Sequence, residues 1–175
     1  MSRPQVVVLT GQSGVGKSHV ATSLAHHGYS VLDVAEALRD SLPRDEQRSR
    51  AFLGEEFIAR EGRAAIFSAI RDAVEPGVDT VMDAVRLAET CEAIKGWQPA
   101  SEVWLVEAER ELRMERLRSR LRVTGELAPR ALEAYQRFDD ELPRLRQLAD
   151  VVLVNDASLE HLEDQVVRVL AAREH

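Results

Sequence analysis

Eight consecutive residues near the start of the chain have the types and the spacing of a phosphate-binding loop. Residues 11–18 read Gly-Gln-Ser-Gly-Val-Gly-Lys-Ser, which matches the Walker A pattern G-x-x-x-x-G-K-[ST]. The glycines let successive backbone N–H groups point inward around an anion. Lys17 would reach the β- and γ-phosphates, and the Ser18 hydroxyl would hold Mg²⁺. The loop therefore predicts a nucleoside triphosphate with magnesium as ligand. The expected nucleotide contacts in this segment are Gly11, Ser13, Gly14, Val15, Gly16, Lys17, Ser18 and His19.

Two aspartates each end an apolar run, where ligands gather in open α/β sheets. Thr80-Val81-Met82-Asp83 has the form of a Walker B strand, and Asp83 would orient Mg²⁺ through water. Val31-Leu32-Asp33 places a second carboxylate near the same edge. Asp33 has two open interpretations, a general base or magnesium-water ligand and an N-cap for the helix that follows, and the two are compatible.

Arginine makes bidentate contacts to phosphate, and four arginines stand out by position. Arg39 and Arg86 each follow one of the two aspartates, and we expect both to contact a phosphate group. For Arg120 and Arg122, at the start of a lid-like turn, a role in the lid and a place on a solvated helix surface are both open. Arg113 and Arg118 are expected to lie on a helix surface, paired with neighbouring glutamates.

Short apolar runs alternate with longer amphipathic stretches, the signature of a parallel sheet wrapped by helices. Each run is rich in Val or Leu, as expected for strands buried on both faces. The predicted strands are Gln5–Thr10, Tyr29–Asp33, Thr80–Asp83, Glu102–Glu107 and Asp150–Asn155. The predicted helices are Lys17–His26, Val34–Ser41, Gly54–Ala73, Arg86–Lys95, Glu109–Arg120, Pro129–Leu148 and Ser158–Arg173.

We therefore expect an α/β fold, a three-layer α/β/α sandwich of the P-loop NTPase type with a five-stranded parallel sheet. Nothing in the sequence divides the chain, so residues 1–175 are predicted to form a single domain. Two segments interrupt the alternation, an acceptor flap over about 36–75 and a short lid over about 118–130 that contains Gly125 and Pro129.

The composition bounds the class of partner. A net charge of −7 argues against a broad nucleic-acid-binding surface, which demands clustered Lys and Arg. No apolar run is long enough to span a bilayer, and no signal peptide is apparent. The single cysteine, Cys91, excludes an internal disulfide and is interpreted as a buried apolar residue. We expect a cytoplasmic protein, a monomer or homodimer, whose partner is a small molecule.

These residues, in this order, resemble the P-loop kinases of small molecules, nearest to the nucleoside monophosphate kinase and dephospho-coenzyme A kinase group. Beyond the Walker A loop, Asp33-Val34-Ala35-Glu36-Ala37-Leu38-Arg39 resembles the Asp-x-Asp-x-x-x-Arg region of dephospho-coenzyme A kinases. Met82-Asp83-Ala84-Val85-Arg86 is similar to the Asp-Gly-x-(Pro)-Arg segment that grips the acceptor phosphate in that group. With the arginine-rich lid and the Ala149–Asn155 segment, the whole chain looks like a family of small P-loop proteins related to dephospho-coenzyme A kinase, best known in archaea.

The resemblance implies transfer of a phosphoryl group from ATP, with Mg²⁺, to a small phosphorylated acceptor, most simply a (deoxy)nucleoside monophosphate or a nucleotide-like metabolite. Arg39, Asp83 and Arg86 would hold the acceptor. The implied catalytic groups are Lys17, Asp33, Arg120 and Arg122, the metal would lie by Ser18, Asp83 and Asp33, and Asn155 would sit by the nucleotide base.

The chain departs from the group at Ala35, where dephospho-coenzyme A kinases carry a second aspartate. The acceptor and the preferred base of the donor therefore stay open at this stage. Two alternatives stay open as well. One is a dephospho-coenzyme A kinase, with Asp33 as base toward a ribose 3′-hydroxyl. The other is a nucleotide-dependent ATPase or switch module.

Overall fold

A computed structural model describes residues 5–42, 52–121, 133 and 136–173. Five parallel strands form one sheet in the order β2-β3-β1-β4-β5. The strands are β1 (Val6–Thr10), β2 (Ser30–Asp33), β3 (Thr80–Asp83), β4 (Glu102–Glu107) and β5 (Val151–Val154). The predicted α/β sandwich of the P-loop type, with five parallel strands, is confirmed, and each strand end lies within one residue of its expected place.

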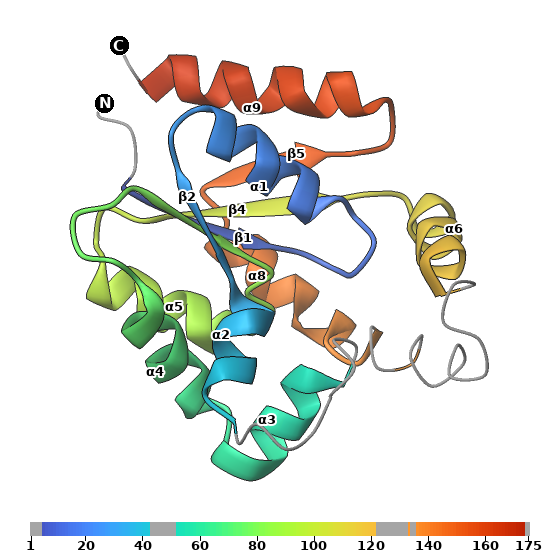
Figure 1. Ribbon diagram of the computed structural model, residues 1–175. Helices are drawn as coiled ribbons and strands as arrows, with labels where there is room; N and C mark the ends of the chain where they lie inside the picture. The colour runs from blue at the N-terminus through green and yellow to red at the C-terminus, as the bar shows by residue number, and fades with distance from the viewer. Residues whose placement is uncertain (1–4, 43–51, 122–132, 134–135, 174–175) are drawn as a thin grey trace.

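Helices cover both faces of this sheet (Figure 1). One layer consists of α1 (Lys17–His26) and α9 (Leu159–Arg173), and α6 (Arg110–Leu121) projects beyond the sheet edge. The other layer holds α2 (Val34–Asp40), α3 (Leu53–Glu61), α4 (Ala64–Ala73), α5 (Ala88–Trp97), the 3₁₀ turn η2 (Asp139–Glu141) and α8 (Leu142–Leu148).

Two apolar cores result, one on each face, because successive strand side chains point to opposite sides. Val7 and Leu9 of β1 pack in the core beneath α1 and α9, whereas Val6 and Val8 pack against the α2–α5 layer. Cys91 lies in the second core, where burial raises the pKa of its thiol to about 12. Its interpretation as a buried apolar residue is therefore confirmed.

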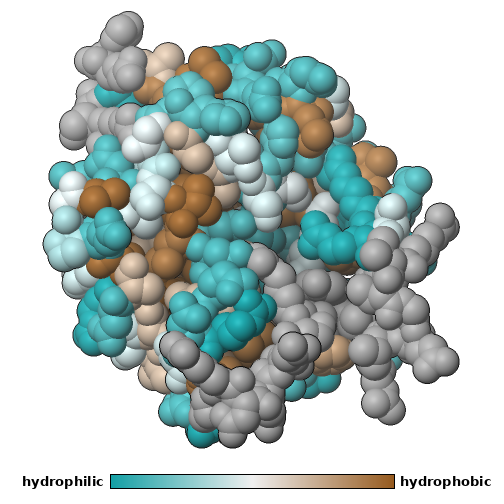
Figure 2. All heavy atoms as spheres, viewed as in Figure 1, coloured by the Kyte–Doolittle hydropathy of each residue, from teal (hydrophilic) through white to brown (hydrophobic). Residues whose placement is uncertain are grey.

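The edge strands do not have the double burial expected of every strand. Val31 of β2 and Val152 of β5 are 44% and 50% exposed, because each edge strand has a neighbour on one side only. On the face drawn in Figure 2, apolar side chains form small groups among hydrophilic ones. Isolated exposed valines of this kind are ordinary on protein surfaces.

Two predicted helices are interrupted or shortened. The stretch predicted as one helix over Gly54–Ala73 is two helices, α3 and α4, because Gly62 takes a φ of +85° that ends the first. In the region predicted as a helix over Pro129–Leu148, residues 139–148 form η2 and α8, with Pro143 in the first turn of α8, where its missing N–H is tolerated. Residues 122–132 and 134–135, and with them most of the predicted lid, lie outside the described residues.

The helix predicted from Arg86 begins instead at Ala88. Ala84 has a φ of +75°, which turns the chain away from β3 and leaves residues 84–87 as a loop. The Ala88 N–H donates to the Glu141 carboxylate at 3.1 Å, so the cap of this helix comes from a distant segment. Arg86 is therefore a loop residue at the carboxyl edge of the sheet.

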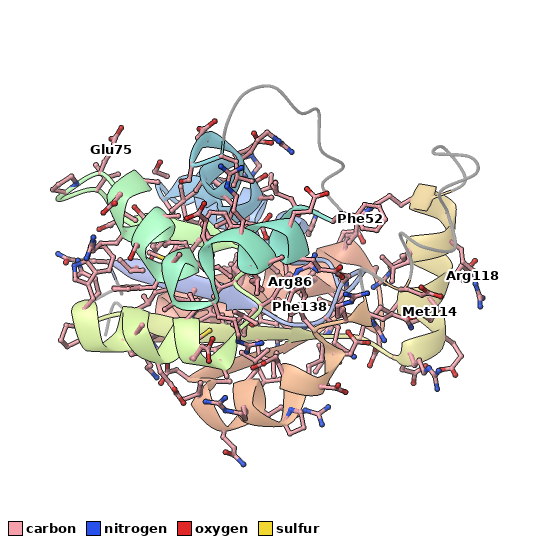
Figure 3. The ribbon with its side chains drawn as sticks, turned by 90° about the horizontal axis from the view of Figure 1, so that it is seen from below. Phe52, Glu75, Arg86, Met114, Arg118 and Phe138 are labelled. Carbon is pink, nitrogen blue, oxygen red and sulfur yellow. The ribbon has the colours of Figure 1, made fainter. Side chains whose placement is uncertain are left out.

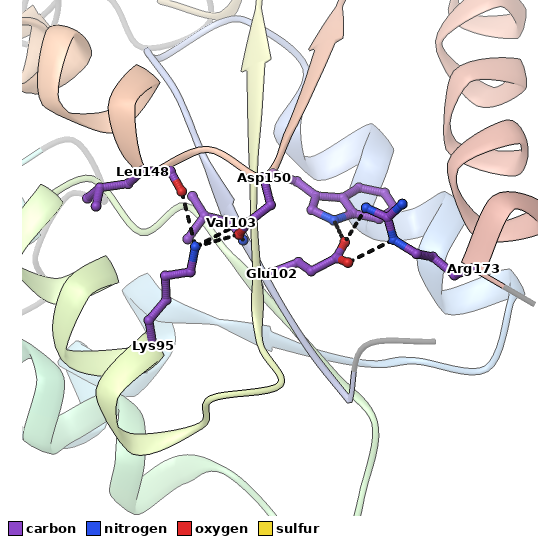
Figure 4. Close-up of polar contacts among 7 residues, drawn as sticks. Lys95, Glu102, Val103, Leu148, Asp150 and Arg173 are labelled. Atoms are coloured by element: carbon purple, nitrogen blue, oxygen red, sulfur yellow. Dashed lines mark hydrogen bonds and ion pairs between the residues drawn. The ribbon is translucent and has the colours of Figure 1, made fainter. Parts of the chain in front are cut away.

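Charged side chains at the amino ends of β4 and β5 hold the helices on the sheet (Figure 4). Lys95 of α5 pairs with Asp150 at 2.7 Å, and Asp150 also accepts from the Val103 N–H. Glu102 accepts from Arg173 of α9 at 2.8 Å and from the indole of Trp104. These contacts lie at the opposite end of the sheet from the phosphate-binding loop.

Candidate active site

The loop between β1 and α1 has the backbone of an anion-binding cradle. Gly11, Gly14 and Gly16 all have positive φ. At all three a side chain would also clash, since a Cβ would lie 2.2 Å from Val106 O at Gly11, 2.8 Å from Arg113 O at Gly14 and 2.5 Å from Asn155 Nδ2 at Gly16. The buried Ser13 hydroxyl has no hydrogen-bond partner among the described residues. This unused donor suits a phosphate oxygen.

Asn155 supports the loop from behind. It follows β5, is almost fully buried, and donates from Nδ2 to Val15 O at 2.8 Å. Its backbone carbonyl accepts from Arg116 of α6 at 3.2 Å. The Asn155 side chain therefore positions the loop backbone. The place beside a nucleotide base that the resemblance implied for Asn155 stays a prediction.

Lys17 is buried and folded back onto the loop. Its Nζ donates to Gly11 O at 2.8 Å and to Gln12 O at 2.7 Å. Burial, with a smaller contribution from the Arg86 guanidinium, lowers the pKa of Lys17 from 10.5 to about 7. An ammonium group in this environment is under-neutralised, so an anion in the cradle would be strongly favoured.

Ser18, Asp83 and Asp33 converge as predicted. Asp33 and Asp83 are directly opposite one another in the β2–β3 register, and the Ser18 hydroxyl donates to Asp83 Oδ2 at 2.9 Å. Asp83 is buried, and its Oδ1 accepts no hydrogen bond from the part of the chain described. Asp33 Oδ1 accepts from the Ala35 N–H at 2.9 Å, which makes it the N-cap of α2, and its side chain also lines the loop cavity.

These residues fit a magnesium ion bound with a nucleotide. The free Asp83 Oδ1 can accept from a metal-bound water, and the Ser18 hydroxyl is a hard oxygen ligand. Among the described residues no group of three His, Cys, Asp or Glu side chains forms a metal site of its own. The metal would therefore depend on phosphate oxygens for much of its coordination.

The predicted arginines separate into two groups. Arg86 and Arg120 both line a 660 Å³ cavity in front of the loop, together with Lys17, Ser18, His19 and Asp83. His19 also lies 3.1 Å from Glu163 of α9. Arg39 pairs with Glu36 one turn back on α2 and is not one of the described residues that line this cavity. Arg122 lies outside the described residues.

The sequence did not single out Phe138, whose ring covers the Arg86 guanidinium with the Cζ atom 5.8 Å from the ring centre (Figure 3). No local pattern distinguishes this phenylalanine from the other three.

The surface position expected for Arg113 is wrong. Arg113 is 3% exposed and donates to Asp139 Oδ2 at 2.9 Å, whereas Arg118 on the same helix is exposed as predicted. The partner Asp139 lies 26 residues away, beyond the reach of a helix-spacing argument.

A second, smaller cavity adjoins the first. It lies between α2, α3 and the loop after β3, and it measures about 70 Å³. Ala84 and Arg86 line both cavities. Arg86 therefore stands between the space in front of the phosphate-binding loop and the space under the flap helices.

Comparison with known proteins agrees with this geometry. Residues 7–134 match the AAA domain family. A UPF0200 protein of Aeropyrum pernix is 33% identical, and the match covers 93% of this chain and 90% of the relative. A UPF0200 protein of Pyrobaculum aerophilum is 31% identical, and the match covers 94% of this chain and 96% of the relative. The chain belongs to the AAA domain family and to the UPF0200 proteins. The resemblance to a family of small archaeal P-loop proteins is thus confirmed.

Solved structures add the fold type. Shikimate kinase from Acinetobacter baumannii, in complex with shikimate, superposes with a TM-score of 0.61 at 18% identity, covering 98% of this UPF0200 chain and 94% of the kinase. This identity establishes the P-loop kinase-like fold alone. The matches do not single out the dephospho-coenzyme A kinase group, so that part of the resemblance stays a prediction. In the described part of this chain, no helix has the length and apolar character to cross a membrane.

Proposed function

We propose that this UPF0200 protein transfers the γ-phosphoryl group of ATP to a small phosphorylated acceptor. The observation that carries the proposal is the place of Arg86, which lines both the cavity in front of the phosphate-binding loop and the adjoining cavity under α2 and α3. An acceptor phosphate held by Arg86 would lie next to the γ-phosphate of a nucleotide in the loop. An enzyme that only hydrolyses ATP has no need of a second cavity beyond that arginine.

Catalysis would come from positioning and charge neutralisation, because phosphoryl transfer leaves little covalent work to the protein. Lys17 and the loop N–H groups would hold the β- and γ-phosphates, and Ser18 and Asp83 would hold the magnesium ion. When bound, Mg²⁺ bridges the phosphate oxygens and neutralises charge that develops on them. Arg120, at the end of α6, faces the same cavity and would contact the transferring group.

The proposal is tested by ADP release from Mg·ATP with a panel of acceptors. The panel contains ribo- and deoxynucleoside monophosphates, dephospho-coenzyme A and simple phosphate monoesters. We expect one acceptor class to stimulate release at least tenfold. Lys17→Ala should abolish this stimulation. Arg86→Ala should raise the acceptor KM by about 10- to 100-fold through loss of a charge-assisted contact. The control Arg118→Ala, on exposed surface, should leave the stimulation and the acceptor KM unchanged. Slow hydrolysis indifferent to every acceptor would favour an ATPase or switch instead.

Asp33→Asn separates a phosphate acceptor from a hydroxyl acceptor. Asparagine is as good an N-cap as aspartate, so α2 keeps its cap while the carboxylate is lost. A phosphate dianion needs no deprotonation, and we expect kcat to fall less than about fivefold. A hydroxyl acceptor, as in a dephospho-coenzyme A kinase, would lose a general base and about 10²- to 10⁴-fold in kcat. A loss of that size would contradict the phosphate acceptor and support the hydroxyl alternative.

A further inference from the structure

The cavity under α2 and α3 has an apolar wall. Its largest contributors are Leu38, Leu53, Ile66, Val85, Leu87 and Phe138, and Arg86 is the one charged side chain among the described residues that line it. Five of these apolar side chains are almost fully buried in the surrounding core. The wall therefore consists of packed core residues and not of exposed surface side chains. A ligand body in this space would be held by contact with hydrocarbon.

Such a wall does not suit a nucleobase. A buried base leaves its amino, carbonyl and ring nitrogen groups unpaired unless the site supplies donors and acceptors. No described side chain of the wall other than Arg86 carries a hydrogen-bonding group. The volume of about 70 Å³ is also small. An engineered cavity of ~150 Å³ in another protein holds one six-carbon benzene ring, so a body of roughly three or four carbons fills a cavity half that size.

The polar end of the ligand is defined by Arg86. Its guanidinium lies at the junction with the loop cavity, and the Phe138 ring packs on it (Figure 3). Phe138 also stands close to α3, since a Cβ on Gly54 would lie 3.7 Å from its ring. The ring therefore lines the apolar cavity, contacts the Arg86 guanidinium and helps to fix its position beside the phosphate-binding loop.

We propose that the acceptor is the phosphate monoester of a short hydrocarbon alcohol, with the phosphate on Arg86 and the hydrocarbon in the apolar cavity. This inference rests on the proposed phosphotransferase function. An oxygen of the acceptor phosphate forms a bond to the γ-phosphorus, and the bond from that phosphorus to the β–γ bridging oxygen breaks, leaving its electron pair on ADP. The product is the organic diphosphate, and no proton need be removed from the dianionic acceptor.

The test is a chain-length series of alkyl phosphates, methyl to octyl, with Mg·ATP and ADP release as readout. Burial of each methylene should raise kcat/KM about fourfold until the cavity is full. We expect a maximum near propyl or butyl phosphate and a decline by octyl, with phosphorus NMR detecting the alkyl diphosphate. A flat series, or turnover of nucleoside monophosphates at more than ten times the best alkyl phosphate, would overturn the inference.

Variants of the residues that line the cavity show whether the apolar wall sets the optimal alkyl chain length. Ala35 lines the cavity at the start of α2, so Ala35→Val should move the optimum to a shorter chain by about one carbon. Ile66→Val removes one carbon from the part of the wall that α4 contributes and should move the optimum to a longer chain. Ala59→Val, on an exposed position of α3 away from the wall, should leave the optimum in place. An optimum that moves in none of the cavity variants contradicts the assignment.

The two proposals fail in different ways. Rapid phosphorylation of a nucleotide that depends on Lys17 and Arg86, with no alkyl phosphate consumed, would overturn the hydrocarbon acceptor and leave the phosphotransferase intact. ATP hydrolysis unaffected by any phosphate monoester, nucleotide or alkyl, would overturn both.

Discussion

The charge state of Lys17 is decided by its surroundings rather than by its type. The side chain is enclosed by the phosphate-binding loop, with Arg86, Arg113 and Arg120 nearby. Among the described residues that shift its pKa, only Asp83 acts in the opposite direction. Desolvation and like charge both disfavour the ammonium form, which is why the pKa of Lys17 falls to about 7 without a ligand. A triphosphate in the cradle would reverse this balance and restore the charged form.

Nucleotide binding should therefore take up a proton at Lys17. With a pKa of about 7 in the free protein, the lysine is largely neutral at pH 8, and binding of Mg·ADP should raise its pKa and bind close to one proton per site. At pH 6 the lysine is already protonated, and the uptake should vanish. Isothermal titration calorimetry in two buffers of different ionisation enthalpy measures this number directly. Lys17→Met should remove the uptake at pH 8, and equal uptake in that variant would assign it to another group.

At the scale of elements, the ends of the helices matter more for the site than their middles. Ala84 turns the chain and Ala88 begins α5, so that Arg86 lies in a loop at the sheet edge. Gly62 divides α3 from α4 and lets α3 lie over the apolar cavity that Leu53 and Gly54 line. These breaks determine which side chains face the two cavities.

Two glycine substitutions test the role of the α3–α4 break. Gly62 has φ +85° and ψ 163°, a conformation that other residues rarely adopt, and a Cβ there would meet no atom within 4 Å. Gly62→Ala should lower the free energy of unfolding by about 1–3 kcal/mol through backbone strain alone. Gly96→Ala, in the last turn of α5 and equally open, should raise it by roughly 0.4–1 kcal/mol. Urea denaturation compares the two, and effects of the same sign would refute the explanation.

At the scale of the whole molecule, the described residues contain a buried link between the two sides of the site. Arg113 of α6 reaches Asp139 of η2, and a Cβ on Gly14 would lie 2.8 Å from Arg113 O. Phe138 and Asp139 in turn face the loop residues Gly11 and Gln12 across a narrow gap. The first turn of α6, the phosphate-binding loop and the Phe138 ring over Arg86 therefore form one packed unit.

Removal of the Arg113–Asp139 ion pair should destabilise the folded protein. Arg113→Met leaves the partly buried Asp139 carboxylate without its cation, and the free energy of unfolding should fall by about 2–3 kcal/mol, less than a fully buried pair would lose. Arg118→Met, an exposed position on the same helix, should change it by under ~0.5 kcal/mol. Thermal or urea unfolding of the two variants measures the difference. Equal stabilities would show that the Arg113 ion pair contributes nothing.

The sequence by itself determined the strands, the phosphate-binding loop and the meeting of Asp33 with Asp83. Each of these depends on consecutive residues: apolar runs make buried strands, glycines permit the loop, and parallel strands that end in aspartate bring their carboxylates to one edge. The same local patterns could not predict that β2 and β5 are partly exposed, since edge position depends on strand order.

Only the tertiary structure decided which distant groups meet. The start of α5 depends on Glu141, the loop is supported by Asn155 from β5, and Arg113 is buried by Asp139. In each case the partner lies 26 or more residues away, and no local periodicity links the two members. Helix ends, ion-pair partners and the apolar wall beside Arg86 are properties of packing. Packing depends on which surfaces meet when the chain folds, whereas the loop and the strands follow from neighbouring residues alone.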